Sequence, residues 1–480
     1  MLPRCSRFLP CLGAGLLTAL LSPSLAAQET VALRGARIVP VQGEEVPEGT
    51  LLIQGGKITA LGPLAAVKVP FDAKVIDVKG KVLFPGYVYA HSQAGVDRAN
   101  ESLPVTPFLD VYDSIDPSSW ALEELLREGV TTVHVIHGED TAVGGVGRVI
   151  RPLGLTVEEL TLRAPSGLKL FVGARQGWDR VRQRAQLREA FAGLEDHLQQ
   201  VAERRFAEEE KKAGRDPLKV APAEARQKGR ALIRDEDVDE QRRNLYRLCQ
   251  GRLDAWVYCQ RAQDVPFALA LAAEQGFLDR STFVLGPECW RAASLLQEAK
   301  RPVVLDPPLL HRERDPDTGR EVERFVAQDW ARSGLPFALL PDPAAGLAER
   351  FLWYQAARCV REGLPRAAAL EAITLAPARM LGVGELVGSL EPGKLADVLV
   401  LSGDPLSATT HVEQVLIAGQ VVYRRDQDHR MRRLLGEEPS VGGAARGAEA
   451  HPHPEEEDGP QVPRVHAEQP EEEPGPGGRR

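Results

Sequence analysis

The sequence predicts an α/β protein in which a parallel sheet, either a closed barrel or an open sheet, is joined to a small β domain. Three observations lead to this class. Short apolar runs alternate with helical patterns in the middle of the chain, β-rich segments stand at both ends, and 480 residues are enough for a large barrel with an appendage. A composition of 43% hydrophobic and 26% charged residues fits a globular protein and excludes wholesale disorder.

Residues 1–26 have the pattern of a secretory signal peptide. Arg4 and Arg7 form a basic start, residues 12–21 are apolar, and residues 24–26 form a small-residue cleavage site. The apolar run is too short to span a bilayer comfortably, and no later segment has about 20 consecutive apolar residues. We therefore expect an exported protein, periplasmic or extracellular after signal cleavage, with no transmembrane span.

Short strands at both ends of the chain predict a composite β domain. The strand-like segments are 31–39, 50–61, 74–83, 396–401 and 412–423. Gly55, Gly56 and Gly419 supply the turns within them, where a positive φ favours glycine. We therefore assign residues 29–85 and 386–430 to one β domain.

The region between these ends, residues 86–385, is predicted to form the larger α/β body. Its strand-like runs are 130–136, 168–172, 255–258, 282–285, 302–305 and 337–340. The strongly charged stretch 187–248 is predicted to form helices on the outside of this body. Residues 437–480 form an acidic tail rich in Pro, Glu and Gly, which we expect to be disordered. The formal net charge of -9 argues against nucleic acid as a partner.

Several segments resemble the amidohydrolase superfamily. Residues 80–91 read GKVLFPGYVYAH and are similar to the approach to its first barrel strand. Residues 388–401, GSLEPGKLADVLVL, are similar to the return into its β domain, and residues 372–379, AITLAPAR, to its penultimate helix. The segments EGVTT at 128–132 and GG at 144–145 fit the imidazolonepropionase-like branch.

The resemblance covers residues 31–424 and implies a TIM-like (β/α) barrel with a composite β sandwich. It also implies a metal-dependent hydrolase that cleaves C–N bonds of small molecules at the carboxyl-end mouth of the barrel. A bound divalent cation lowers the pKa of its water to about 7 and so supplies hydroxide at neutral pH. The superfamily's last strand ends in an Asp that carries the water's proton to the leaving nitrogen, and Asp342 stands at that place here.

The resemblance weakens at the metal-binding positions. His91 keeps the first imidazole of the superfamily's His-x-His motif, but Gln93 replaces the second with a neutral amide. The lysine that some members carbamylate to bridge two metals falls near Arg151, whose fixed positive charge repels a cation. Tyr258 or Cys259 stands where a His ends the fifth strand. Two metal ligands of the superfamily then remain. They are His91, which alone would bind a metal weakly, and Asp342 at the end of the last strand.

Other residues offer alternative sites. His137 and Glu139 follow a predicted strand and, together with His91 and Asp342, would rebuild a relocated metal site. Residues three apart on a strand face opposite sides, so His137 contributes only if it has already entered the loop.

A metal-free mechanism and a structural ion pair are further alternatives. Cys259 would be a thiolate nucleophile with Glu288 as the acid, although a buried core thiol is the simpler interpretation of this cysteine. The sixth strand, which Glu288 follows, carries no His. Arg151 and Asp342 would form an ion pair across the barrel mouth, in the space that cations occupy in active relatives.

Three functional interpretations therefore stay open. The first is an exported amidohydrolase-like hydrolase of non-peptide or small cyclic amide bonds, with most metal ligands replaced and one divalent metal, zinc before others. The alternative is a catalytically inactive barrel, a pseudoenzyme without metal that binds a small ligand or partners an active amidohydrolase relative. The third, which rests on composition alone, is a structural or surface-interaction protein that works through its acidic tail.

Overall fold

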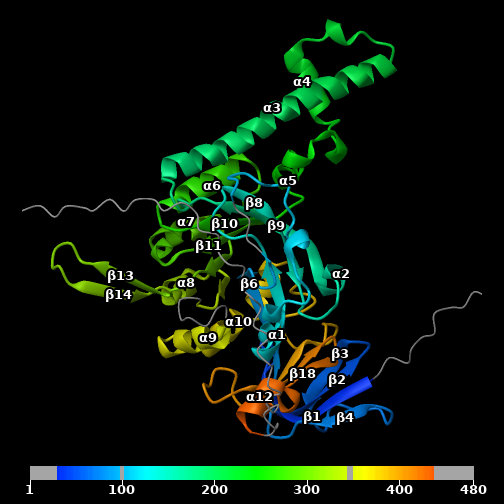
Figure 1. Cartoon of the computed structure of the whole chain (residues 1–480), viewed down its shortest axis with the longest axis vertical. Coiled ribbons are helices and arrows are strands. Elements are labelled where there is room, and N and C mark those ends of the chain that lie inside the picture. Colours follow the sequence, from blue (N-terminus) through cyan, green and yellow to red (C-terminus); the bar gives the residue numbers. More distant parts are fainter. Residues whose placement is uncertain (1–29, 98–101, 343–349, 437–480) are drawn as a thin grey trace, which may run out of the picture. The chain divides into compact units, whose positions relative to one another are not determined.

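A computed structural model describes residues 30–97, 102–342 and 350–436 (Figure 1). The predicted signal peptide, residues 1–26, and the predicted tail, residues 437–480, lie outside the described residues. Those described up to Asp428 belong to one compact unit, and those from His429, with the short helix α12 (His429–Leu434), to a second. Among the described residues no helix is both long and apolar enough to cross a membrane.

Strands from both ends of the described chain pair in one sheet in the order β18-β17-β16-β5-β1-β2-β3, with β4 beside β1. Their bounds are β1 (Thr30–Ile38), β2 (Val46–Gln54), β3 (Lys57–Pro63), β4 (Lys74–Asp77), β5 (Val82–Pro85), β16 (Val398–Leu401), β17 (Val412–Ile417) and β18 (Gln420–Arg424). The two ends meet where β5 pairs antiparallel with β16. Gly55 and Gly56 turn between β2 and β3 with φ of 60° and 77°. Because sheet and barrel lie in the same compact unit, a separate β domain stays a prediction.

The second sheet has eight strands and curls into a nearly closed barrel in the order β15-β12-β11-β10-β9-β8-β7-β6. Its strands are β6 (Tyr87–Ser92), β7 (Val130–Val135), β8 (Val143–Ile150), β9 (Thr161–Phe171), β10 (Ala255–Cys259), β11 (Ser281–Leu285), β12 (Val303–Leu305) and β15 (Phe337–Leu339). The predicted α/β, TIM-like class therefore describes this part of the chain.

One strand departs from the parallel arrangement. β8 pairs antiparallel with both β7 and β9, with Val133 opposite Ile150 and Val143 opposite Leu170. The loop from β7 to β8, residues 136–142, is too short for the crossover that a parallel connection requires. The expectation of an all-parallel sheet is therefore wrong at β8, and the chain after β8 is at the opposite end of the barrel from the chain after β7.

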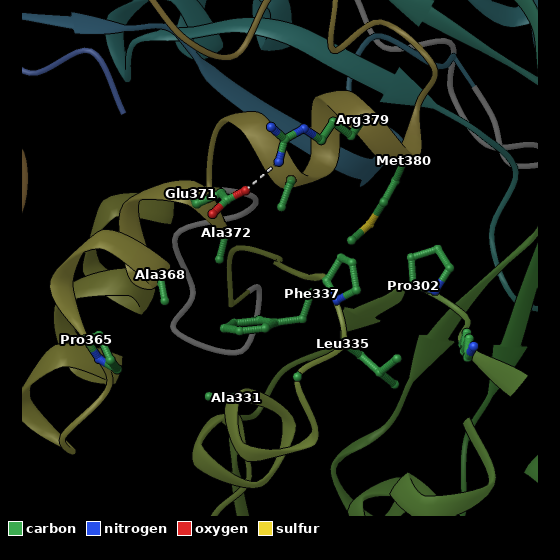
Figure 2. A pocket seen from close by; sticks show the side chains of 14 residues that line it. Pro302, Ala331, Leu335, Phe337, Pro365, Ala368, Glu371, Ala372, Arg379 and Met380 are labelled. Carbon is green, nitrogen blue, oxygen red and sulfur yellow. Dashed lines mark hydrogen bonds and ion pairs between the residues drawn. The ribbon is translucent and has the colours of Figure 1, made fainter. Parts of the chain in front are cut away.

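The barrel closes at a seam between β15 and β6, which we define as the gap filled by residues 372–373. Val88 N donates to Ile373 O at 3.0 Å, and Leu339 N donates to Ala372 O at 3.0 Å. The two edge strands are not paired with each other. Backbone oxygens of the two-residue segment 372–373 instead accept a hydrogen bond from one backbone N–H of each strand. Figure 2 shows Ala372 pointing toward the Phe337 ring on this side of the barrel.

Helices cover the outside of the barrel. They are α1 (Trp120–Arg127), α2 (Val157–Leu160), α3 (Arg180–Lys212), α4 (Pro222–Arg230), α5 (Glu240–Cys249), α6 (Asp264–Glu274), α7 (Ala293–Ala299), α8 (Ala327–Ser333), α9 (Leu352–Arg361), α10 (Arg366–Glu371) and α11 (Leu375–Met380). The charged stretch 187–248 thus lies in α3, α4 and α5 and the turns between them. α3 begins where Asp179 Oδ1 accepts a hydrogen bond from Arg182 N at 2.7 Å, an N-cap.

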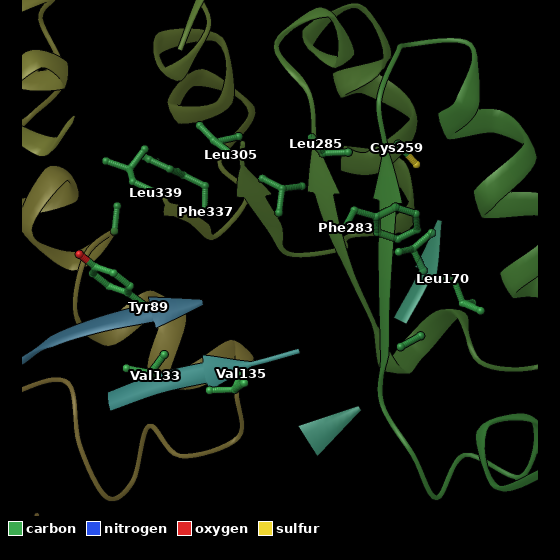
Figure 3. Close-up of a cluster of buried hydrophobic side chains, with 14 of the residues drawn as sticks. Tyr89, Val133, Val135, Leu170, Cys259, Phe283, Leu285, Leu305, Phe337 and Leu339 are labelled. Atoms are coloured by element: carbon green, nitrogen blue, oxygen red, sulfur yellow. The ribbon is translucent and has the colours of Figure 1, made fainter. Parts of the chain in front are cut away.

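A large apolar core lies between the barrel strands and these helices (Figure 3). A smaller cluster fills the barrel interior, where Val88, Ala90, Phe171 and Tyr258 face inward. On β9 and β10 the neighbours of these residues face the outer core, as the two-residue period of a strand requires. Alternation along β9 and β10 therefore decides which side chains reach the site.

Gly86, just before β6, tests the packing that positions this strand. A Cβ at Gly86 would lie 1.9 Å from Thr131 Oγ1, so Gly86→Ala must displace β7. We expect Gly86→Ala to lower the free energy of unfolding by ~1–3 kcal/mol in urea denaturation. Gly193→Ala is the control, because no atom lies within 4 Å of its added Cβ in the middle of α3. Equal stability of the two variants would contradict the close packing at Gly86.

Candidate functional site

Ionisable and polar side chains gather at the carboxyl-end mouth of the barrel, where barrel folds carry their sites. Each comes from the end of a different strand or from the loop that follows it. They are His91 on β6, Glu139 after β7, Lys169 on β9, Tyr258 on β10, Asp306 after β12 and Asp342 after β15. We call this set the mouth cluster.

Lys169 is the centre of the mouth cluster and is fully buried. Its Nζ lies 2.9 Å from His91 Nε2 and 3.3 Å from the backbone oxygen of His137. An ammonium only donates, so His91 Nε2 must be the acceptor and the ring must be neutral. Burial first, and then the charge of Lys169, hold the pKa of His91 well below its usual range, in agreement with this geometry.

Tyr258 stands beside two carboxyl groups of the mouth cluster. Its hydroxyl donates to Asp306 Oδ2 at 2.8 Å, and Glu139 is near enough to help raise the pKa of that hydroxyl. The Lys169 Nζ lies 5.5 Å from the centre of the Tyr258 ring, which favours a cation over its face.

Two carboxyl groups of the mouth cluster, those of Asp306 and Glu139, hold their protons unusually well. Burial, and then the charge of Glu139, raise the pKa of Asp306 to about 7. Burial also raises the pKa of Glu139, and in both groups the charge of Lys169 works in the opposite direction. Asp342 is near enough for its charge to add to the rise at Asp306. Asp306 is thus divided between its acid and base forms near neutral pH, as proton transfer requires.

The structure corrects the prediction for Arg151. β8 runs antiparallel to β7, so Arg151 follows it at the amino-terminal end of the barrel, away from the mouth and from Asp342. Its charge acts instead on Asp397, whose pKa burial raises to about 6 and Arg151 lowers. Arg151 Nε and Nη1 are buried without a hydrogen-bond partner among the described residues. The inward-facing cation of the mouth is Lys169.

The proposed Cys259 nucleophile is also corrected. Cys259 faces the outer core, one position along β10 from the inward Tyr258 (Figure 3). Burial raises the pKa of its thiol well above the usual value, and its backbone oxygen accepts from Cys289 Sγ at 3.2 Å. Glu288 lies after β11 with its Oε2 4.0 Å from Arg261 Nε. Cys259 therefore does not lie where a thiolate nucleophile is needed.

The other predicted residues divide between the mouth and its rim. Gln93 is exposed just beyond β6. His137 is 8% exposed, has already entered the loop after β7, and its Nε2 has no hydrogen-bond partner among the described residues. A Cβ at Gly145 would lie 2.5 Å from that nitrogen, so glycine there leaves room for the ring. The structure thus places His91, Glu139 and Asp342 at the same end of the barrel and the His137 carbonyl beside Lys169.

Comparison with known proteins agrees with this fold. The profile of the Amidohydrolase family matches residues 303–423, a segment that includes Asp306 and Asp342. Imidazolonepropionase from Symbiobacterium thermophilum is 27% identical over 78% of this chain and 89% of that protein. Imidazolonepropionase from Solibacter usitatus is 24% identical over 79% of this chain and 92% of that protein. The crystal structure of an amidohydrolase from Thermotoga maritima MSB8 is 27% identical, with a TM-score of 0.67 over 82% of this chain and all of that chain.

These comparisons support a place in the amidohydrolase superfamily, in its imidazolonepropionase-like branch. Superfamily members typically hold a divalent metal such as zinc. In this chain the unmodified mouth cluster does not fit such an ion. No three His, Cys, Asp or Glu side chains of the described residues converge on one point, and the Lys169 ammonium occupies the His91 nitrogen that a metal would need.

Sequence reasoning missed two members of the mouth cluster, Lys169 and Asp306. Lys169 is the charged residue within the apolar run 168–172, and Asp306 directly follows the run 302–305. An ionisable residue inside or just after a barrel strand is a usable signal, because strand ends meet at the mouth. The resemblance instead drew attention to Arg151, and the reversal at β8 was not visible in the sequence.

The raised pKa of Asp306 predicts a pH dependence of stability. The carboxyl has a pKa of about 7 in the folded chain and about 4 in the unfolded chain, so the folded chain binds more protons between these values. Stability should therefore fall as pH rises from about 4 to about 7. We expect Asp306→Asn to flatten this fall in thermal unfolding, because the amide cannot ionise.

The exposed Asp317→Asn is the matched control and should follow the wild-type curve across the same pH range. A curve for Asp306→Asn that is parallel to wild type would show that Asp306 ionises normally in the folded protein.

Proposed function

We propose that this protein hydrolyses a carbon–nitrogen bond of a small molecule, such as a cyclic amide, held at the barrel mouth. The observation that carries the proposal is the mouth cluster itself, where Asp306 with a pKa of about 7 stands beside a buried ammonium. Membership of the superfamily supports the reaction class, and the proteins named imidazolonepropionase support a small cyclic substrate. The mouth cluster differs from a metal centre, so the proposed steps use only its own side chains.

Each group of the mouth cluster has a place in this reaction. Asp306 accepts the proton of the attacking water as the new C–O bond forms at the amide carbon. The Lys169 ammonium faces the oxygen that becomes negative, where a fixed charge inside a protein is effective. Asp306 then returns the proton to the nitrogen as the C–N bond breaks, which leaves a carboxylic acid and an amine.

The positions of the other groups fit supporting roles. Tyr258 holds Asp306 through the 2.8 Å hydrogen bond. His91 accepts from Lys169 and so fixes the direction of the ammonium. Asp342, which the sequence nominates for the proton transfer, acts here through its charge on Asp306.

We also propose that the protein acts outside the cytoplasm. The support is the sequence of residues 1–26, which has the pattern of a signal peptide and lies outside the residues that the structure describes.

Substitutions in the mouth cluster test the proposed activity. A panel of cyclic amides, cyclic ureides and N-acyl amines would be offered to the full protein and hydrolysis followed by product chromatography. For the best substrate, we expect Asp306→Asn and Lys169→Met each to lower kcat/KM by at least ~100-fold. The surface variants Asp317→Asn and Lys219→Met should keep full activity.

Folding of each variant is checked by its thermal unfolding. Hydrolysis that survives both mouth substitutions in folded protein would contradict the assignment. Binding of a panel member without turnover would favour the inactive, ligand-binding barrel.

Metal content tests whether the mouth works without a cation. We expect the purified protein to retain far less than one zinc, manganese or iron per chain after incubation with the metal, because Lys169 occupies His91 Nε2. Mass spectrometry of metals gives the count. A second sample incubated with bicarbonate tests carbamylation of Lys169, which would replace the ammonium by a carboxylate. Stoichiometric metal in either sample would contradict the metal-free assignment.

A further inference from the structure

A hollow of about 590 Å³ lies beside the seam (Figure 2). It stands where β12 and β15 begin, so it is at the opposite end of the barrel from the mouth cluster. It is bounded by α8, α10 and α11 and by the residues at which β12 and β15 begin. We call it the seam cavity. It is lined by Lys300, Pro302, Ala331, Gly334, Leu335, Pro336, Phe337, Pro365, Ala368, Glu371, Ala372, Ala376, Arg379 and Met380.

The lining is that of a site for an apolar molecule. Only Lys300, Glu371 and Arg379 of the fourteen lining residues carry charge. The Phe337 ring lies in the middle of the hollow, between Ala368 and Ala372 on one side and Ala331 on the other (Figure 2). The volume is in the range of small-molecule sites, roughly 300–1,000 Å³. An apolar body placed there would remove apolar surface from water.

The charged residues of the lining determine which polar group of such a molecule would fit. Glu371 Oε1 lies 2.7 Å from Arg379 Nη1, so these two charges largely cancel, and Arg379 Nη2 also donates to Gln42. Lys300 ends α7 in a left-handed conformation with φ of 53° and is exposed. Its ammonium has no ion-pair partner among the described residues, so the lining has a net charge of +1.

We propose that the seam cavity binds a small amphiphile with an apolar body and one anionic group, such as an alkyl carboxylate. The chain packs in the hollow against Phe337, Ala368 and Met380, and the carboxylate lies at Lys300. Met380 is unbranched and half-buried, so it can adjust to the ligand's shape. The site is independent of the hydrolysis proposed above, since no residue of the mouth cluster lines it.

The cavity also touches the segment that closes the barrel. Ala372, whose oxygen accepts from Leu339 N, lines it, and Phe337 begins β15. A ligand in contact with both residues holds the two sides of the seam together. Binding should therefore slow hydrogen exchange at the Leu339 amide as well as raise the unfolding temperature.

Calorimetric titration of the full protein with octanoate tests the proposal, with octan-1-ol and octylamine as neutral and cationic probes. We expect saturable binding of octanoate. Ala368→Phe and Ala331→Leu, both at half-buried positions, fill the hollow and should abolish binding. Lys300→Gln should weaken the binding of octanoate by about fivefold and leave the affinity for octan-1-ol unchanged. Lys57→Gln, on the strand β3, is the matched charge control and should bind as wild type.

Four results would overturn the proposal. The first is no saturable octanoate binding to the wild type, and the second is equal binding to both filled variants, shown to be folded by thermal unfolding. The third is a preference for octylamine. Self-association that either filling substitution abolishes, seen by sedimentation, would assign the hollow to a second copy of the chain and also overturn it. None of these results bears on activity at the mouth cluster.

Discussion

The buried ammonium of Lys169 is the constraint on which the chemistry of this barrel depends. A charge without exposure to water is tolerated only where polar groups replace its hydration. His91 Nε2 and the His137 carbonyl supply acceptors, and the charges of Glu139 and Asp306 supply attraction. The same contact keeps His91 neutral and takes up the nitrogen that a metal would need. The Lys169 charge also keeps the pKa of Asp306 lower than burial and the charge of Glu139 alone would make it.

Backbone geometry places that ammonium. Lys169 reaches the interior because β9 pairs with β10 in parallel and with β8 antiparallel, which fixes the face to which each residue points. The strand β8 occupies one position in the barrel with its direction reversed. The barrel then lacks direct pairing between β15 and β6, and the oxygens of Ala372 and Ile373 satisfy the two edges instead. A helix-to-helix connection thus becomes part of the barrel wall, and the seam cavity lies beside it.

The chain is similar to proteins named imidazolonepropionase, and its mouth differs from a metal centre. The segments that resemble the superfamily most, residues 80–91 and 388–401, contribute mainly to the sheet in which both chain ends pair and to its junctions with the barrel. Such segments report the fold, because they are fixed by strand pairing. The mouth cluster is drawn from six separate strand ends, so similarity at the two ends of the chain does not determine its donors.

The sequence by itself determined the strand-rich ends, the alternation of strands and helices, and the turn at Gly55 and Gly56. It also named four members of the mouth cluster: His91, Glu139, Tyr258 and Asp342. These follow from local patterns, since periodicity and glycine's tolerance of positive φ act over a few residues. Only the tertiary structure decided that Arg151 lies at the far end, that Cys259 faces outward, and that Lys169 contacts His91 at the mouth, where Asp306 also lies. Those outcomes depend on the direction of β8 and on contacts between strands far apart in the chain, such as β6 and β9, and neither leaves a periodic trace in the sequence.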